Sequence, residues 1–227
     1  MGYAGSVEDL VLQRARAGYY GHMTHIDHQI NRFVESLRDL GVGDNTWVCF
    51  TSDHGELMGD HHLFRKSHAY EGSARVPLIL TGPDGCGVAG GLRSDAVVEL
   101  RDIMPTLLDI AGVPVPATVE GRSLLGLARG ADAPVRDYLH GEHVHRGQSI
   151  QWLTDGREKY LWLSGTGREQ LFDLRSDPQE CRDLARSGAG ARLDRWRARL
   201  IAELAGREEG FTDGAKLIPG RPVHPVL

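Results

Sequence analysis

The sequence is short of cysteine, of long apolar runs and of positive charge, and each shortage excludes a class of protein. Only three of its 227 residues are cysteines, widely spaced, and this odd number argues against a disulfide framework. No apolar run approaches the roughly 20 residues that a membrane-spanning helix needs. A formal net charge of −5 leaves no basic excess for binding nucleic acid. We therefore expect a globular protein with neither a membrane span nor a nucleic-acid partner. No signal peptide opens the sequence, so we expect a cytoplasmic location.

Lysine is also scarce, because only three of the 26 lysine and arginine residues are lysines: Lys66, Lys159 and Lys216. Where arginine is the default cation, a lysine indicates a position that suits a compact ammonium better than a planar guanidinium. Lys66 ends a polar loop, in a place where such a group could meet an anion. We predict that Lys66 binds an oxyanion.

The stretch from Trp47 to Lys66 organises the chain. Its apolar start, WVCFT, predicts a buried parallel strand, which stops at Asp53, His54 and a glycine. Open α/β sheets place their ligands at the carboxyl ends of such strands. A carboxylate beside a neutral imidazole suits a divalent cation, so we predict that Asp53 and His54 are metal ligands.

Periodicity predicts the other elements. An apolar stripe three and four residues apart favours a long helix over residues 7–40. Apolar runs and turn residues predict a strand at 75–81, a helix at 101–111 and a helix at 191–205. Between residues 137 and 173, four short runs separated by tight turns indicate an antiparallel meander. The tail from residue 210 is expected to be an extended surface segment.

Several motifs together resemble the sulfatase family of the alkaline-phosphatase superfamily. They are TSDHGELMGDHHLFRK followed by SHAYEGSARVPLILTGP, then LRDIMPTLLDIAGVPVPATVEGRSLLGL, and later LTDGREKYLWLSGTGREQLFDLRSDPQECRDLA. They cover nearly the whole chain in the order seen in the carboxy-terminal portion of bacterial arylsulfatase-like proteins. The family's Cys-x-Pro/Ala-x-Arg motif, whose cysteine or serine becomes the formylglycine nucleophile, is not encoded here. Neither is the upstream pair of aspartates that completes its metal site.

The resemblance implies a fold and a domain organisation. The fold class is α/β, part of an alkaline-phosphatase-like sandwich with a central mixed or parallel sheet and flanking helices. A small antiparallel α+β carboxy-terminal subdomain follows. The implied domains are residues 1–130, as the carboxy-terminal part of the sulfatase α/β domain, and residues 131–227, as the subdomain with its covering helix and extended tail.

The resemblance also implies a chemistry. A divalent cation assists the hydrolysis of a small sulfate ester. Calcium is the first choice for that cation, with manganese, magnesium or zinc as alternatives. Asp53 and His54 would be two of its ligands, and Lys66 would neutralise charge on the sulfuryl oxygens. Some family members carry asparagine at the position of His54. Histidine is found there in phosphonate and phosphate ester hydrolases of the superfamily and in many bacterial sulfatases, so the resemblance leaves both sulfate and phosphate or phosphonate esters as substrates.

Two further histidines are candidate substrate-binding residues. His22 lies nearest the apolar stripe of the first helix, although an amphipathic helix with a polar flank explains its histidines as well. His143 belongs to the run His140–His145, for which a loop at the rim of the substrate pocket, a structural cluster and a zinc site are the alternatives. If this run is a strand, His143 and His145 share one side and Glu142 lies on the other.

Three functional classes are compatible with the sequence. They are a sulfuric ester hydrolase, a phosphonate or phosphate ester hydrolase on the same scaffold, and a non-catalytic truncated fragment. Without the nucleophile motif, we expect no turnover by these residues alone. Because buried parallel strands need cover on both faces, we also expect self-association or dependence on a missing amino-terminal half.

Overall fold

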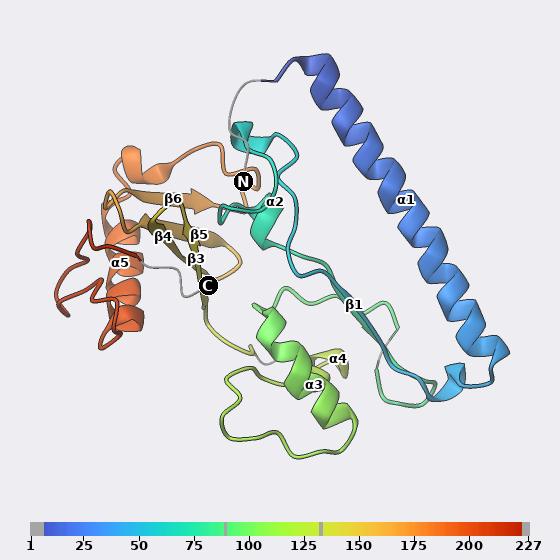
Figure 1. Ribbon diagram of the computed structural model, residues 1–227. Helices are drawn as coiled ribbons and strands as arrows, with labels where there is room; N and C mark the ends of the chain where they lie inside the picture. The colour runs from blue at the N-terminus through green and yellow to red at the C-terminus, as the bar shows by residue number, and fades with distance from the viewer. Residues whose placement is uncertain (1–6, 89, 132–133, 224–227) are drawn as a thin grey trace. The chain divides into compact units, whose positions relative to one another are not determined.

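The computed structural model describes residues 7–88, 90–131 and 134–223 (Figure 1). Its helices and strands follow in the order α1 (Asp9–Asp39), β1 (Val48–Thr51), α2 (Glu71–Ala74), β2 (Leu78–Thr81), α3 (Ile103–Ile110), α4 (Leu125–Ala128), β3 (Leu139–His145), β4 (Gln148–Thr154), β5 (Glu158–Leu163), β6 (Glu169–Asp173) and α5 (Gly190–Leu204). Short 3-10 turns lie at Gly43–Asn45, Asp60–His62, Leu100–Asp102 and Leu184–Arg186.

The chain forms two compact units that interleave along the sequence. The first unit takes its residues from the ranges 1–65, 75–94 and 100–133, and the second from 66–74, 95–99 and 134–227. The predicted boundary near residue 130 lies close to residue 134, where the last stretch of the second unit begins. The prediction did not place the segment 66–74 in the second unit. The assignment of residues 1–130 and 131–227 as domains stays a prediction.

In the first unit, α1 follows the predicted helix closely and ends at a glycine. Gly41 has a φ of 70°, and its amide donates to the carbonyl of Arg38. This left-handed conformation is a common helix ending and favours glycine. No residue of α1 is buried, although its apolar stripe is present as expected.

The strands β1 and β2 pair antiparallel, with Val48 opposite Thr81 and Thr51 opposite Leu78. The expectation that the run after Trp47 forms a buried parallel strand is therefore wrong for this pair. Neither strand contains a buried residue. An apolar run of this length indicates a tendency toward burial, but the path of the connection decides the strand's direction.

In the second unit, the four strands β3 to β6 form the predicted antiparallel meander in sequence order. The run His140–His145 lies within β3 and pairs with β4, which excludes a loop, one of the three alternatives for this run. The turn at Arg146 and Gly147, both with positive φ, returns the chain into β4. Strand alternation puts His143 and His145 on one face and Glu142 on the other, as expected.

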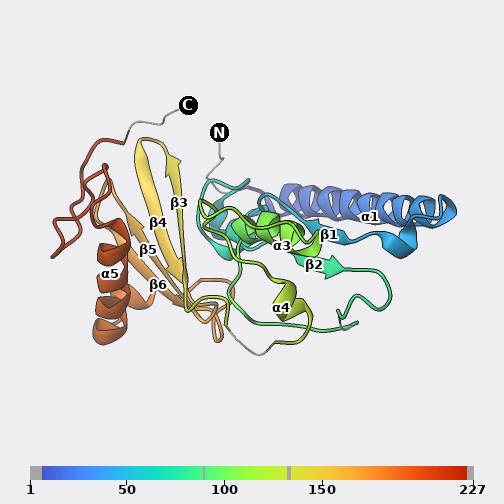
Figure 2. The same ribbon diagram turned by 90° about the horizontal axis from the view of Figure 1, so that it is seen from below.

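One face of this sheet is covered by α5, as predicted for the helix at 191–205 (Figures 1 and 2). Its Trp196, Leu200 and Leu204 are buried in a cluster with Leu153, Tyr160, Trp162, Leu171 and Phe211. Phe211 comes from the tail and packs edge-on against Trp162, with ring centroids 5.6 Å apart. The tail is therefore anchored in the core at its start.

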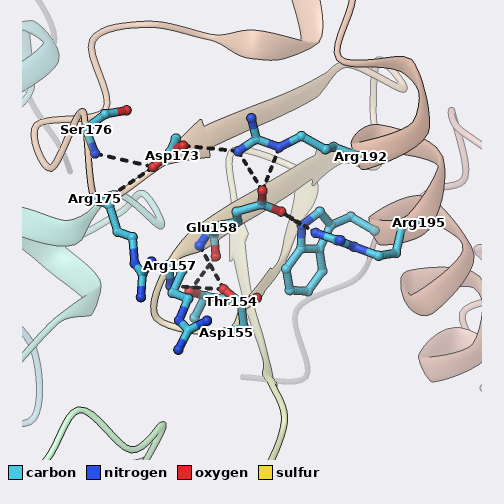
Figure 3. A network of polar contacts seen from close by, with 10 residues as sticks. Thr154, Asp155, Arg157, Glu158, Asp173, Arg175, Ser176, Arg192 and Arg195 are labelled. Atoms are coloured by element: carbon cyan, nitrogen blue, oxygen red, sulfur yellow. Dashed lines mark hydrogen bonds and ion pairs between the residues drawn. The ribbon is translucent and has the colours of Figure 1, made fainter.

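Polar contacts at the edge of this interface centre on Glu158 of β5 (Figure 3). Its carboxylate accepts hydrogen bonds from Arg192, from Arg195 and, at 2.6 Å, from the indole Nε1 of Trp196. Arg192 also donates to Asp173 at the end of β6. One carboxylate thus joins the helix to the sheet.

The other face of the sheet is covered by the segment 66–74. Ala69 is buried in a cluster with Ile150, Leu161 and Phe172, and Tyr70 packs against it. The Tyr70 hydroxyl donates to Gln170 Oε1 at 3.1 Å. Residues that directly follow Lys66 thus complete the core of the carboxy-terminal sheet, which the sequence patterns did not indicate.

All three cysteines are free thiols, as expected, and Cys49 is half-buried, which raises the pKa of its thiol. No helix in the described part of the chain has the length and apolarity to cross a membrane.

Candidate functional site

The turn directly after β1 brings Asp53 and His54 together. Oδ2 of Asp53 lies 3.4 Å from Nε2 of His54, while Oδ1 accepts the backbone amide of His54 at 3.0 Å. The Ser52 hydroxyl donates to the carbonyl of His54 at 2.7 Å and fixes the turn. The side chain of Asp53 is largely exposed and that of His54 is about one-third exposed. The two side chains therefore lie together and are accessible to solvent.

The position of the ring fixes the chemistry of His54. Its Nδ1 lies 2.8 Å from the carbonyl of Gly55, and a carbonyl oxygen can only accept, so Nδ1 carries a proton. In the neutral imidazole, Nε2 then offers a lone pair toward Asp53. Two electron-rich atoms 3.4 Å apart repel each other unless a cation or a proton lies between them.

This spacing fits two ligands of one divalent ion. Ligand atoms at about 2.0–2.6 Å from an ion, at nearly a right angle to each other, lie about 3–3.7 Å apart. The hydrogen bond from Nδ1 to a carbonyl is the usual support of a metal-binding histidine. Among the residues that the structure describes, no group of three or more metal-capable side chains converges, so the pair supplies only part of a coordination shell.

The loop after the pair is tightly constrained. Oε1 of Glu56 accepts the amides of both Met58 and Arg65, and Leu57, next to Glu56, is fully buried. Within this loop four non-glycine residues have left-handed φ values of 50–68°: Met58, His61, His62 and Arg65. Such backbone strain gathers at functional sites because the surrounding structure has to enforce it.

The helix α1 holds this loop in place. Nε of Arg16 donates to the carbonyl of Met58 at 2.9 Å, and its guanidinium pairs with Asp60 at 3.1 Å. Leu12 packs so closely on Gly59 that an added Cβ would lie 2.6 Å from its methyl group. The role of α1 in positioning the loop was not apparent from the sequence.

Lys66 lies one residue beyond this loop and belongs to the second unit. Its side chain is exposed, and its carbonyl accepts the hydroxyl of the buried Ser73 at 2.8 Å. The structure therefore brings Asp53 and His54 together in the first unit and places Lys66 on the segment that covers the carboxy-terminal sheet.

His143 lies on β3, exposed, in a row of aromatic rings. Its ring stacks on His145 at a centroid distance of 6.3 Å, and His145 meets His68 edge-on at 5.4 Å. Burial, with Arg146 and His143 nearby, lowers the pKa of His145 and favours the neutral ring. Glu142 points to the opposite face and pairs with Arg207, so this strand gives no support to the zinc alternative. His22 is exposed on α1 and takes no part in this row.

Comparisons with known proteins are consistent with the geometry. The Sulfatase family model matches residues 3–113, and the model of the carboxy-terminal part of N-sulphoglucosamine sulphohydrolase matches residues 59–205. An arylsulfatase of Clostridium perfringens is 49% identical over 222 residues, which are 96% of this chain and 46% of that arylsulfatase. The chain belongs to the sulfatase family. It spans about half the length of this sulfatase relative.

Solved structures extend the comparison. The phosphonate monoester hydrolase from Silicibacter pomeroyi matches with a TM-score of 0.76 and 28% identity, over 85% of this chain and 41% of the hydrolase. A protein solved in complex with its substrate D-glucosamine-2-N,6-O-disulfate matches with a TM-score of 0.73 and 25% identity, over 80% of this chain and 38% of that protein. The alkaline-phosphatase-like α/β fold class predicted for this sulfatase-family chain is thereby confirmed.

Sequence reasoning missed the contact of His68 with His145. The alternation in His-Val-His had indicated that His143 and His145 share one face of a strand. His68 gave no comparable signal, because its contact with β3 depends on the path of the segment 66–74.

Proposed function

We propose that this chain provides the metal-binding and anion-stabilising part of a sulfuric ester hydrolase. The observation that carries the proposal is the Asp53–His54 pair, whose facing oxygen and nitrogen have the spacing of two ligands on one ion. Membership of the sulfatase family and the 49% identity to an arylsulfatase support sulfate esters as the substrate class.

Asp53 and His54 would hold a divalent cation. Such an ion, when bound, polarises the ester oxygens and makes the sulfur or phosphorus more electrophilic. Asp53 contributes the negative charge that a hard cation needs, and the Gly55 carbonyl keeps the His54 lone pair directed outward. Calcium is our first choice, with manganese, magnesium or zinc as alternatives.

Lys66 would bind the anionic part of the substrate. Its ammonium can donate three hydrogen bonds to oxygens that gain negative charge as the ester bond breaks. We propose a small sulfate ester as substrate. The glucosamine disulfate complex of the matching structure indicates that a sulfated sugar is one form to test.

A second candidate is the hydrolysis of phosphonate or phosphate esters. The match to a phosphonate monoester hydrolase favours it, because that structure superposes with a TM-score of 0.76. The geometry of Asp53 and His54 serves either anion, since both reactions place charge on oxygens beside a cation.

The first experiment is calorimetric titration of calcium and manganese into the chain and into Asp53→Ala. We expect weak binding by the parent, because two ligands are a partial shell, and at least about tenfold weaker binding by the variant. Asp44→Ala, in an exposed turn of the same unit, is the matched control. Equal affinity of the parent and Asp53→Ala would place the metal elsewhere.

Turnover requires a second experiment. We expect none from the 227 residues alone, so we would also build a chimera in which this chain replaces the matching residues of the Clostridium perfringens arylsulfatase. This chimera and the chain are assayed with an aryl sulfate and an aryl phosphonate. Faster turnover of the sulfate supports the first candidate, and faster turnover of the phosphonate supports the second.

A further inference from the structure

The chain buries a lysine that the proposed reaction does not use. Lys159 lies on β5 with only 1% of its side chain exposed, on the face that the segment 66–74 covers. A buried ammonium is unfavourable unless it is paired and hydrogen-bonded. Its contacts therefore show what this charge holds together.

Three oxygens surround the ammonium of Lys159. Nζ lies 2.5 Å from Oε1 of Glu71 and donates to the carbonyl of Ala69 at 2.8 Å. It also lies 3.1 Å from Oε1 of Glu180, with which it forms an ion pair. Two of the three oxygens belong to the segment 66–74.

Glu180 binds the same segment from its other oxygen. Its Oε2 accepts the amide of Glu71 at 2.6 Å. The Glu180 side chain is almost fully buried, and its backbone has a left-handed φ of 55°. Burial raises the pKa of Glu180, and the charge of Lys159 opposes this rise. Lys159 thus favours the charged form of the Glu180 carboxyl, whose Oε2 accepts the amide of Glu71.

Lys66 is connected to this network through a short path. The segment turns at α2, where the amides of Ser73 and Ala74 donate to the carbonyl of Tyr70. Ser73 is buried, and its hydroxyl donates to the carbonyl of Lys66 at 2.8 Å. The backbone of Lys66 is therefore fixed to a turn that Lys159 and Glu180 hold on the sheet.

We propose that Lys159 is a positioning residue for Lys66, acting through the segment 66–74 that it fixes to the sheet. The inference rests on the anion-binding role proposed for Lys66. A group that stabilises charge in a reaction works only when it is placed to within a fraction of an ångström. The carboxy-terminal sheet holds Lys66 in place through the buried ion pairs of Lys159 on β5 with Glu71 and Glu180.

The positioning itself is tested by hydrogen–deuterium exchange of the 227-residue chain and of Lys159→Met, which keeps the length of the side chain and removes its charge. We expect the amide of Glu71 to exchange more than about tenfold faster in the variant, and the β3–β4 hairpin to stay unchanged. Lys216→Met, at an exposed lysine, is the matched control. Unchanged exchange at Glu71 would overturn the proposal.

If Lys159→Met does not fold, the double variant Lys159→Met/Glu180→Gln replaces it. This variant removes both charges and keeps similar volumes, a change that buried ion pairs often tolerate. The amide of Glu71 then faces a neutral acceptor, and we expect it to exchange faster than in the parent. Parent-like exchange would again count against the proposal.

The link to Lys66 is tested by a double-mutant cycle in the arylsulfatase chimera. We expect Lys159→Met to lower kcat by up to about 100-fold with little change in KM. In the Lys66→Ala background the same change should lower kcat by less than about twofold further. Equal losses in both backgrounds would show that Lys159 does not act through Lys66.

These results separate the two proposals. If Lys66→Ala turns over the aryl sulfate as fast as the parent, or if the parent chimera is inactive, the function proposed for Lys66 fails. The exchange measurement still decides whether Lys159 fixes the segment.

Discussion

The indole nitrogen of Trp196 donates a 2.6 Å hydrogen bond to Oε2 of Glu158, so a fully buried residue of α5 is tied to the first residue of β5. Trp196 is fully buried, and Glu158 also accepts from two arginines of the same helix. One mostly buried carboxylate therefore sets how α5 docks on the sheet.

We predict that Glu158→Ala destabilises the second unit by about 2 kcal/mol, because it leaves a buried indole N–H without its acceptor. The measurement is urea unfolding followed by tryptophan fluorescence. Asp194→Ala is the control. Asp194 is exposed and pairs with Arg197 on the same helix, so its loss should change the free energy of unfolding by less than about 0.5 kcal/mol. Equal effects of the two variants would contradict the prediction.

Substitutions of Lys66 test the choice of a lysine at this position. In the arylsulfatase chimera, Lys66→Ala should lower kcat by about 100- to 1000-fold and leave metal content unchanged, since Lys66 binds the substrate's oxygens. Lys66→Arg should restore little, because a guanidinium is wider and directs its hydrogen bonds differently. Turnover of an aryl sulfate and metal analysis provide the measurements. If the Lys66→Arg variant were as active as the parent, Lys66 would have no specific role in the reaction.

We predict that the second unit becomes less stable in acid, because Arg207 pairs with two carboxyl groups that are protonated there. A hydrogen bond from Arg207 lowers the pKa of Glu209. Burial alone would raise the pKa of Glu142, but hydrogen bonds from Arg207 and Gln151 outweigh it and lower that pKa as well. Carboxyls with lowered pKa in the folded state stabilise it above their unfolded pKa of about 4.3, and this stabilisation is lost as the pH falls below that value.

We therefore expect the Tm of Arg207→Gln to depend less steeply on pH between about 3 and 5 than the Tm of the parent. Arg32→Gln is the control, because Arg32 donates to Gln29 rather than to a carboxylate. Thermal melts at half-unit pH intervals give the slopes. A slope in Arg207→Gln as steep as in the parent would assign the acid sensitivity to other carboxyls.

The apolar stripe of α1 predicts self-association. Tyr20, Met23, Ile26 and Phe33 are each at least half exposed. A row of such side chains exceeds what a monomer usually leaves in water. We expect sedimentation velocity to show concentration-dependent association, which Ile26→Glu combined with Phe33→Lys should weaken. His25→Gln, at an exposed polar position of the same helix, serves as the control. A monodisperse monomer at all concentrations would refute this expectation.

Local patterns predicted much of the fold, and the reasons are visible in single elements. The stripe of α1, the short runs and tight turns of β4 to β6, and the spacing of Trp196, Leu200 and Leu204 each depend on residues close in sequence. The same holds for Asp53 and His54, which are adjacent and need only a turn to meet. The sequence reveals such features because neighbouring residues create them.

Features that depend on distant residues were not predicted. The direction of β1 relative to β2 follows from a connection of more than 20 residues. The sequence left the conformation of the run His140–His145 open, because pairing with the distant strand β4 is what makes this run extended. Ala69 and Tyr70 dock on the carboxy-terminal sheet through contacts with residues 90 and 100 positions away in the sequence. A local periodic pattern cannot predict such contacts.

These long separations have a consequence for how the chain is made. Synthesis proceeds from the amino terminus, so the segment 66–74 emerges well before the strands it covers. Ile150, Leu161 and Phe172 obtain their cover from that earlier segment. A nascent chain therefore has to keep this segment available for about 100 further residues, which takes roughly 5–20 s at ordinary rates of translation. Folding of the second unit should be slow for its size, since non-local contacts delay the transition state.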